Sequence, residues 1–190
     1  MYPATPDAVP EDLIDFFAVL QTIGLIDPAT VYSVSRSYSP GPRFYEVIAF
    51  RTQHLVMQLA SACNQMHELV LVDSRRPCRI AFSEVFSEPA FLGMGNTRPP
   101  RCPACGRIVA NWQQAMDVWF ENKTGYRWHC AFCENEVGPA AWDWQHSAAI
   151  VRFTLDITSI RPGEAYPSAQ LLRFLADYLG NQWDYFYFRV

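Results

Sequence analysis

Two stretches of the chain place hydrophobic residues at steps of three and four, the spacing of an amphipathic helix. The first, residues 10–24, opens with a proline and acidic residues and stops at Gly24. The second runs from Ser168, a capping residue type, to Gly180. We therefore expect two helices that each turn one apolar face toward a core. The apolar positions are Leu13, Phe16, Phe17, Leu20 and Ile23 in the first helix, and Leu171, Leu172, Phe174, Leu175, Tyr178 and Leu179 in the second.

Shorter hydrophobic runs, bounded by turn-forming residues, indicate strands. One turn, Ser-Pro-Gly-Pro at residues 39–42, separates two such runs. A third helical pattern begins at Thr52, a capping residue type. Strands are expected at residues 31–38, 43–50, 68–73, 78–82, 149–160 and 183–190, and a further helix at residues 52–65.

The last run, residues 183–190, is aromatic on both faces. Trp183, Tyr185 and Tyr187 share one face of the expected strand, and Phe186 and Phe188 share the other. This pattern favours a strand buried in the middle of a sheet. The alternative is an edge strand that is able to accept a strand from a partner.

The order of these elements predicts an α+β fold. Residues 93–100, a stretch rich in glycine and proline, mark a boundary, and the strand–helix–strand pattern after residue 138 is too short to bury a sheet by itself. Residues 139–190 are therefore expected to complete a sheet begun in residues 1–97. We expect one α+β domain with a small mixed or antiparallel sheet and two or three helices, interrupted by an inserted unit at residues 98–138.

That middle segment carries two Cys-x-x-Cys pairs, formed by Cys102 with Cys105 and by Cys130 with Cys133. A two-residue gap lets one tight turn direct both sulfurs at a single ion, and four thiolates form a tetrahedral zinc site. Gly106 suits the positive φ that follows the second cysteine of such a turn. Iron is the minor alternative, because it also accepts four cysteines. We predict one metal ion, Zn²⁺, held by these four residues.

The segment between the cysteine pairs reads as a β-hairpin, with two aromatic runs around a turn at residues 122–125. Two cysteine knuckles joined through a hairpin resemble the zinc ribbon family of modules. The resemblance covers residues 101–136 only, and the rest of the chain resembles no family. It implies a structural zinc ion. Four cysteines leave no open coordination position, so a catalytic role for the metal is not expected.

Charge argues against a nucleic-acid partner as the first choice. The chain has a formal net charge of −4, and residues 98–138 contain five basic and four acidic side chains with no basic stripe. The acidic balance suits a basic protein partner. Stacking of unpaired bases on the aromatic side chains near the cysteines keeps nucleic-acid binding open as an alternative.

Aromatic residues and arginine dominate protein interfaces, and several lie near the cysteines. The candidate partner-binding residues are Trp112, Trp119, Tyr126, Arg127 and Trp128. A second interpretation is that these rings form the small core of the cysteine unit and its seat on the main domain. The pattern favours this second interpretation.

Catalytic groups are sparse in this sequence. Cys63 lies between His54 and His67, and Cys78 follows two arginines, so an enzyme or a thiol redox sensor is conceivable at either place. No phosphate-binding loop, nucleophile elbow or deaminase signature is present. The sequence therefore predicts a non-catalytic protein-interaction module, such as an adaptor, an inhibitor or an immunity-type protein. No apolar run is long enough for a membrane span and the first residues do not resemble a signal peptide, so a cytoplasmic protein is expected.

Overall fold

The computed structural model describes residues 1–32, 36–51, 78–93 and 95–188. Helices and small antiparallel sheets are mixed along the chain, which confirms the α+β class. The helices are α1 (Leu13–Thr22), α2 (Phe44–Val47), α4 (Trp112–Glu121), α5 (Ala169–Leu179) and the 3₁₀ turn η1 (Pro139–Ala141). The strands are β1 (Tyr2–Pro3), β2 (Ser37–Tyr38), β3 (Ile48–Phe50), β4 (Arg79–Phe82), β5 (Ala90–Gly93), β6 (Trp128–His129), β7 (Glu136–Val137), β8 (Ala148–Val151), β9 (Leu155–Thr158), β10 (Ala165–Pro167) and β11 (Trp183–Asp184).

The sheet with the most strands among the described residues has three, in the order β2-β4-β9, and both neighbouring pairs are antiparallel. The other ladders are pairs, namely β1 with β11, β3 with β10, β5 with β8 and β6 with β7. Strands from the two halves of the chain pair with one another, because β4 pairs with β9 and β5 pairs with β8. The pairings on either side of the cysteine segment therefore bring residues 78–93 and 148–158 together.

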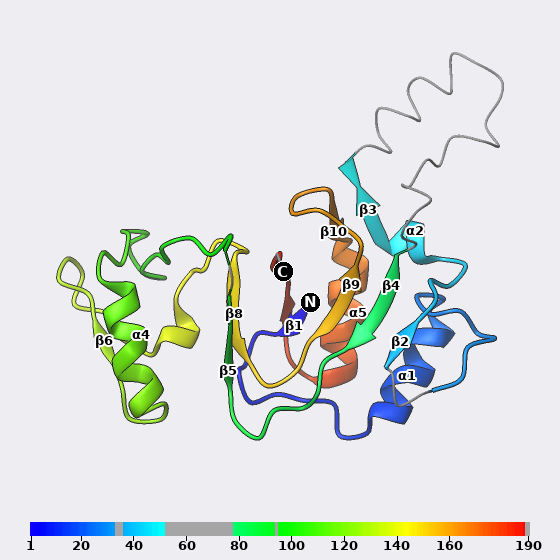
Figure 1. The fold of residues 1–190 in the computed structure, drawn as a ribbon, viewed down its shortest axis with the longest axis horizontal. Coiled ribbons are helices and arrows are strands. Elements are labelled where there is room, and N and C mark those ends of the chain that lie inside the picture. Colours follow the sequence, from blue (N-terminus) through cyan, green and yellow to red (C-terminus); the bar gives the residue numbers. More distant parts are fainter. Residues whose placement is uncertain (33–35, 52–77, 94, 189–190) are drawn as a thin grey trace, which may run out of the picture.

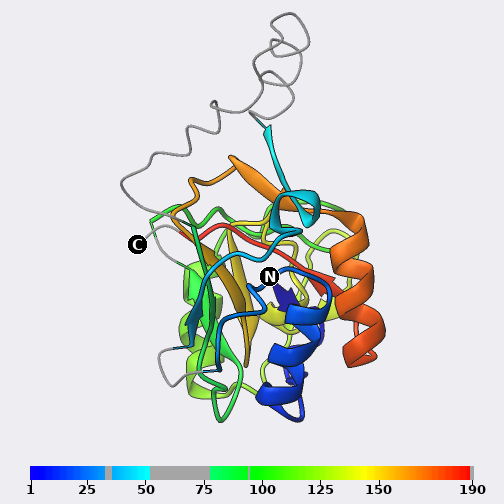
Figure 2. The same cartoon turned by 90° about the vertical axis from the view of Figure 1, so that its right-hand side faces the viewer.

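The main body is built around one core under the β2-β4-β9 sheet. Helices α1 and α5 lie on the same side of this sheet (Figures 1 and 2). Phe16 of α1 is fully buried and stacks on Trp183 of β11, with the ring centroids 6.0 Å apart. Ile80, Leu155 and Leu175 complete the centre of the core. Burial of these large side chains supplies the main driving force for folding of the body.

Helix α1 begins at Leu13, three residues after the predicted start at residue 10, whereas α5 begins directly after its predicted cap Ser168. The Asp12 carboxylate accepts a hydrogen bond from the Ile14 N–H at 2.6 Å at the start of α1. The Ser168 hydroxyl oxygen accepts one from the Leu171 N–H at 3.1 Å at the start of α5, and Gly180 ends α5 with a φ of 62°. Side-chain oxygens satisfy N–H groups that the helix itself leaves unpaired, and glycine adopts positive φ without steric cost. The predicted helices at residues 10–24 and 168–180 are confirmed.

A second core lies in the lobe on the left of Figure 1, which contains α4, β6 and η1. We call residues 98–144 the cysteine lobe. Indole rings form a continuous cluster there: Trp142 contacts Trp128 and Trp144, and Trp112 contacts Trp144, each with ring centroids 5.6 Å apart. Ala148 and Ile150 of β8 and Phe91 of β5 belong to the same core. The lobe is therefore packed directly onto the β5–β8 ladder.

The expected hairpin between the cysteine pairs is wrong, because residues 112–121 form helix α4. Three buried positions, Ala115, Met116 and Trp119, lie at the three- and four-residue spacing of a helix face. The turn at residues 122–125 is present, but it follows the helix, and Asn122 Oδ1 accepts a hydrogen bond from the Gly125 N–H at 3.0 Å. The β pairing of this lobe, β6 with β7, flanks the second cysteine pair.

Four other predicted strands differ from the structure. Of the strand expected at 31–38, residues 37–38 form β2, residues 31, 32 and 36 are not in a strand, and residues 33–35 lie outside the described residues. Residues 44–47 form the short helix α2, so that only β3 remains of the strand expected at 43–50. The run at 149–160 divides into β8 and β9, which belong to different ladders. Within the described part of the terminal run, residues 183–188, the β ladder covers β11 alone, and Phe188 is 46% exposed. Burial of that run in the middle of a sheet is therefore wrong.

Two predicted elements, the helix at 52–65 and the strand at 68–73, lie outside the described residues. The strand at 78–82 corresponds to β4. Within the described ranges, none of the helices is long and apolar enough to cross a bilayer.

Candidate metal centre

The four predicted metal ligands converge at one point of the cysteine lobe. The sulfur atoms of Cys102, Cys105, Cys130 and Cys133 all lie within 4.8 Å of one another. Sulfurs from opposite knuckles approach each other, with Cys102 to Cys133 and Cys105 to Cys130 each at 3.7 Å. Thiolates 2.3 Å from a central ion at tetrahedral angles lie about 3.8 Å apart. The arrangement therefore fits a four-sulfur metal centre.

The two knuckles share one backbone conformation. In each, an N–H four residues after the first cysteine donates to the carbonyl of that cysteine: Gly106 to Cys102 and Glu134 to Cys130, both at 2.9 Å. The donors both have positive φ, 71° at Gly106 and 59° at Glu134. The positive φ predicted for Gly106 is confirmed. Glu134 lacks the conformational freedom of glycine. It nevertheless adopts a positive φ, because its N–H completes the same turn.

Each knuckle is also closed from the other side. The Cys102 N–H donates to the Arg107 carbonyl at 2.8 Å, and the Cys130 N–H donates to the Asn135 carbonyl at 2.9 Å. Both turns are therefore fixed by backbone hydrogen bonds at two points. The side chains between the cysteines of each pair are consequently held at the surface by a rigid frame.

Backbone N–H groups directed at sulfur favour the thiolate form. Burial raises the pKa of Cys102, but hydrogen bonds from the N–H groups of Cys105 and Ala104 outweigh this effect and lower it to about 6. For Cys130, the N–H of Phe132 lowers the pKa, against the effect of burial. The chain thus prepares two of its sulfurs for a cation before one binds.

The fourth thiol shows why the cluster needs a cation. The Asn135 N–H lowers the pKa of Cys133 and burial raises it, and hydrogen bonding with the other three sulfurs raises it to about 12. Four crowded thiolates repel each other unless a positive ion lies among them. The four cysteines are therefore suited to holding one metal ion, while their geometry is compatible with both zinc and iron.

Access to this centre differs between its ligands. Cys102 and Cys130, the first cysteine of each pair, are buried, whereas Cys105 and Cys133 are exposed. His129, next to Cys130, is exposed on β6. The sulfurs thus form the complete donor set that the described residues offer at this point.

The candidate partner-binding residues fall largely into the second core. Trp119 is only 4% exposed, and its Nε1–H donates to the Lys123 carbonyl at 3.1 Å. Trp112, Tyr126 and Trp128 are partly buried against the same core. This placement matches the interpretation of these rings as the core of the cysteine unit. The remaining candidate, Arg127, is exposed, and its guanidinium donates to the Tyr126 carbonyl at 3.3 Å.

The candidate thiol chemistry outside the lobe lies partly beyond the described residues. This applies to Cys63, His54 and His67. Cys78 is described and buried in the body core, where burial, followed by the charge of Glu164, raises the pKa of its thiol. A protonated, buried thiol is a poor nucleophile.

One surface feature of the centre was not singled out from the sequence. Phe132, inside the second Cys-x-x-Cys pair, is 66% exposed, and Ile108, just after the first, is 55% exposed. The guanidinium carbon of Arg107 lies 4.0 Å from the centroid of the Phe132 ring, a cation–π contact that joins the two knuckles. We call Arg107, Ile108 and Phe132 the knuckle-tip surface. The sequence signal that could have identified this surface is Phe132, an apolar residue inside a tight Cys-x-x-Cys turn. Such a turn leaves no room for the side chain to be buried.

Comparison with models of protein families, with curated proteins and with solved structures finds no match for this chain.

Proposed function

We propose that this chain is a non-catalytic protein-binding module in which a structural zinc ion holds the knuckle-tip surface in place. The observation that carries this proposal is the exposure of Phe132 and Ile108 beside the four-cysteine centre. Exposed apolar side chains on a fixed frame lose little conformational entropy when a partner covers them. The aromatic ring and the arginine over it are residue types that are enriched at interface hot spots.

A scaffold role suits the chemistry of the centre better than a catalytic one. Catalytic zinc keeps one coordination position for water or substrate, whereas four cysteine sulfurs fill all four positions. Zinc adds no redox chemistry of its own. We therefore assign the ion to folding, as the element that closes an inserted unit at residues 98–138 in the α+β domain.

The partner in this proposal is a protein. In the same lobe, Trp119 is buried and Trp112 and Trp128 are partly buried in the second core, while Arg127 is an exposed cation. The formal net charge of −4 favours a partner that is basic outside the contact itself. An adaptor, an inhibitor and an immunity-type protein all fit this description, and a cytoplasmic setting suits unpaired, metal-binding cysteines.

The test is affinity capture with matched surface variants. The variant Ile108→Ser with Phe132→Ser removes the apolar knuckle tip, and the control variant Val118→Ser with Phe120→Ser removes two exposed apolar residues of α4. Both variants should retain one metal ion per chain. We expect the partners of the unmodified protein to be lost with the first variant only.

Two results would contradict this proposal. One is capture of the same partners by the knuckle-tip variant. The other is tight binding of single-stranded nucleic acid that weakens steeply with salt, which would favour the nucleic-acid alternative.

A further inference from the structure

The four sulfurs of the metal centre differ in how far solvent reaches them. Cys102 and Cys130, the first cysteine of each pair, are 1% and 2% exposed, whereas Cys105 and Cys133 are exposed. The chain neighbours on either side of each exposed cysteine are exposed as well. A small solute therefore reaches one sulfur in each knuckle, while the other sulfur of that knuckle is shielded.

Each exposed sulfur lies beside a buried sulfur of the opposite knuckle. The Cys133 sulfur is 3.7 Å from that of Cys102, and the Cys105 sulfur is 3.7 Å from that of Cys130. A disulfide bond is about 2.05 Å long, so the sulfurs of each pair would have to approach by about 1.7 Å to form one. Redox-sensor cysteines are accessible to solvent and lie next to a second cysteine that resolves the oxidised form. Both pairs have this arrangement.

The knuckle-tip surface spans the two knuckles. Arg107 follows the first pair and Phe132 lies inside the second, and the guanidinium carbon is 4.0 Å from the centroid of the ring. Backbone hydrogen bonds fix each turn internally, so sulfurs that approach across the centre shift one knuckle against the other. The position of Phe132 relative to Ile108 therefore depends on whether the sulfurs surround an ion or are bonded in pairs.

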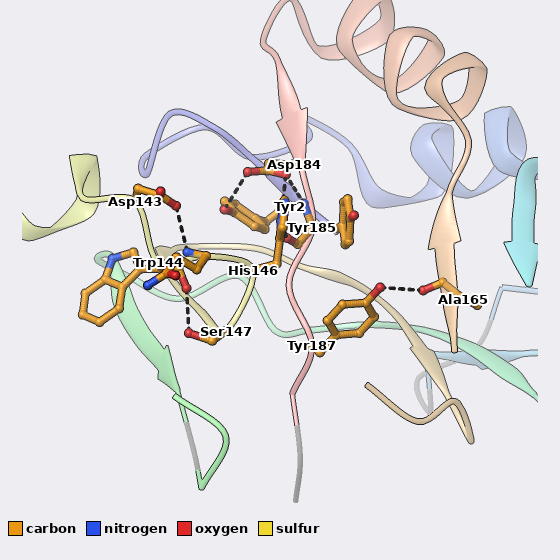
Figure 3. Close-up of polar contacts among 10 residues, drawn as sticks. Tyr2, Asp143, Trp144, His146, Ser147, Ala165, Asp184, Tyr185 and Tyr187 are labelled. Atoms are coloured by element: carbon orange, nitrogen blue, oxygen red, sulfur yellow. Dashed lines mark hydrogen bonds and ion pairs between the residues drawn. The ribbon is translucent and has the colours of Figure 1, made fainter. Parts of the chain in front are cut away.

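The two ends of the cysteine lobe are held by contacts that involve no sulfur. The Ser147 hydroxyl donates to the Trp144 carbonyl at 2.6 Å, as seen in Figure 3, and its oxygen accepts the Arg98 N–H at 2.9 Å. His146 Nδ1 lies 2.7 Å from the Tyr185 carbonyl oxygen of the terminal run. We therefore expect a change of sulfur partners to alter the knuckles and to leave the ends of the lobe in place.

We propose that hydrogen peroxide oxidises the two exposed sulfurs and that each then forms a disulfide with the buried sulfur of the opposite knuckle, which releases the metal ion and makes the knuckle-tip surface lose its partner. The expected disulfides are Cys105 with Cys130 and Cys133 with Cys102. This inference rests on the function proposed above for the knuckle-tip surface and adds its regulation.

The reaction needs only the four sulfurs and the oxidant. An exposed thiolate attacks one oxygen of the peroxide, the O–O bond breaks, and a sulfenic acid and a hydroxide ion form. The thiolate of the opposite knuckle then attacks the sulfenic sulfur, which forms the S–S bond and releases a second hydroxide ion. Two peroxide molecules thus oxidise four thiolates to two disulfides, and the four hydroxide ions take up four protons from solvent. Because thiolates are the ligands, the ion then has none left.

Oxidation of the centre should differ from the loss of one ligand. Two bonds between the knuckles replace the link that an ion provides, so the second core should stay closed. We expect the near-ultraviolet circular dichroism of the tryptophan cluster to be retained in the oxidised protein.

The first test is titration of the zinc-loaded full chain with hydrogen peroxide. The matched control carries Cys63→Ser and Cys78→Ser and keeps only the four cysteines of the centre. Both proteins should release one zinc ion per chain to a chromophoric chelator, with two peroxide molecules consumed per ion, and dithiothreitol with added zinc should reverse the change. Dimedone, which traps sulfenic acids, should label Cys105 and Cys133 during the titration.

The second test identifies the disulfides by mass spectrometry of a tryptic digest without reduction. Trypsin places each Cys-x-x-Cys pair in its own peptide, residues 102–107 and residues 128–152. Disulfides between the knuckles join these two peptides, whereas disulfides within a knuckle leave them separate. We expect the joined form, in which fragmentation between Cys102 and Cys105 assigns the two pairs.

The third test repeats the affinity capture with oxidised protein. Capture of the partners should be lost after peroxide treatment and restored by dithiothreitol with zinc. Separate tryptic peptides, dimedone on Cys102 or Cys130, or zinc that stays bound in peroxide would overturn the proposal. Partner capture that persists in the fully oxidised protein would overturn it as well. The proposed function fails by a different result, namely capture of the same partners by Ile108→Ser with Phe132→Ser in the absence of peroxide.

Discussion

The sulfur of Cys102 lies 3.7 Å from the sulfur of Cys133, and these residues come from different knuckles. The Cys105 and Cys130 sulfurs repeat the distance. An ion held by all four sulfurs would therefore join the two knuckles to each other as well as closing each turn. The lobe has a core of its own, but that core is small and rests on the β5–β8 ladder.

Removing one ligand should cost the lobe its metal and its fold. We expect Cys130→Ser to lower the metal content from one ion per chain to near zero. Structural zinc contributes about 10–16 kcal/mol in small peptides, so the near-ultraviolet circular dichroism of the tryptophan cluster should be lost as well. The body has a separate core and should keep its cooperative melting transition.

The control for this experiment is Cys78→Ser, which changes a buried cysteine of the body. Its metal content should remain at one ion per chain. Full metal content in the Cys130→Ser protein would show that this sulfur is not a ligand.

Acid should release the ion. The pKa of Cys102 is lowered from 9.0 to about 6, so this thiolate stabilises the folded lobe fully above pH 9, and its contribution is lost as the pH falls through about 6. Protons also compete with the metal for every sulfur. We expect release into a chromophoric chelator to rise steeply below about pH 6, with more than one proton taken up per ion. Retention that is independent of pH would exclude thiolate ligation.

Adjacent aromatic residues of α4 should respond differently to truncation. Trp119 is 4% exposed and Phe120 is 51% exposed. We expect Trp119→Ala to lower the free energy of unfolding of the lobe by about 3–5 kcal/mol, because it leaves a cavity in the second core. Phe120→Ala should change it by about 0.5 kcal/mol or less. Denaturant unfolding followed by tryptophan emission measures both values, and equal effects would contradict the orientation of α4.

The cap of α5 offers a test in the body. Its Ser168 hydroxyl accepts the Leu171 N–H, so Ser168→Ala should lower the free energy of unfolding by about 1 kcal/mol. Gln170→Ala, at an exposed position of the same helix turn, should be close to neutral. Thermal unfolding of the two variants provides the comparison, and a neutral Ser168→Ala would mean that the cap bond does not form in solution.

Elements with local signals at both ends were predictable from the sequence. Helices α1 and α5 have a capping side chain, a periodic apolar face and a glycine stop, and each signal acts within a few residues. The two cysteine knuckles were predictable for the same reason, since two residues between cysteines define a knuckle. Helix α4 was missed because its aromatic residues also suit strands, and the turn at residues 122–125 suggested a hairpin.

Features that depend on distant contacts could not be predicted. The exposure of Phe132 follows from the way both knuckles meet, and the hydrogen bond from Met1 to Leu155 joins residues 154 positions apart in the sequence. The predicted strand lengths were wrong for a similar reason, since β11 ends at Asp184, opposite Tyr2, the first residue of its antiparallel partner β1. A sequence pattern indicates whether a segment prefers to form a strand. The number of its residues that pair depends on the partner strand.

X-ray absorption spectroscopy at the metal edge tests the central claim most directly, because it counts the ligands of the ion. The account predicts one ion per chain, with zinc as the metal and four sulfur ligands at about 2.3 Å. An oxygen or nitrogen ligand in place of one sulfur, or purified protein without metal, would contradict a closed structural centre.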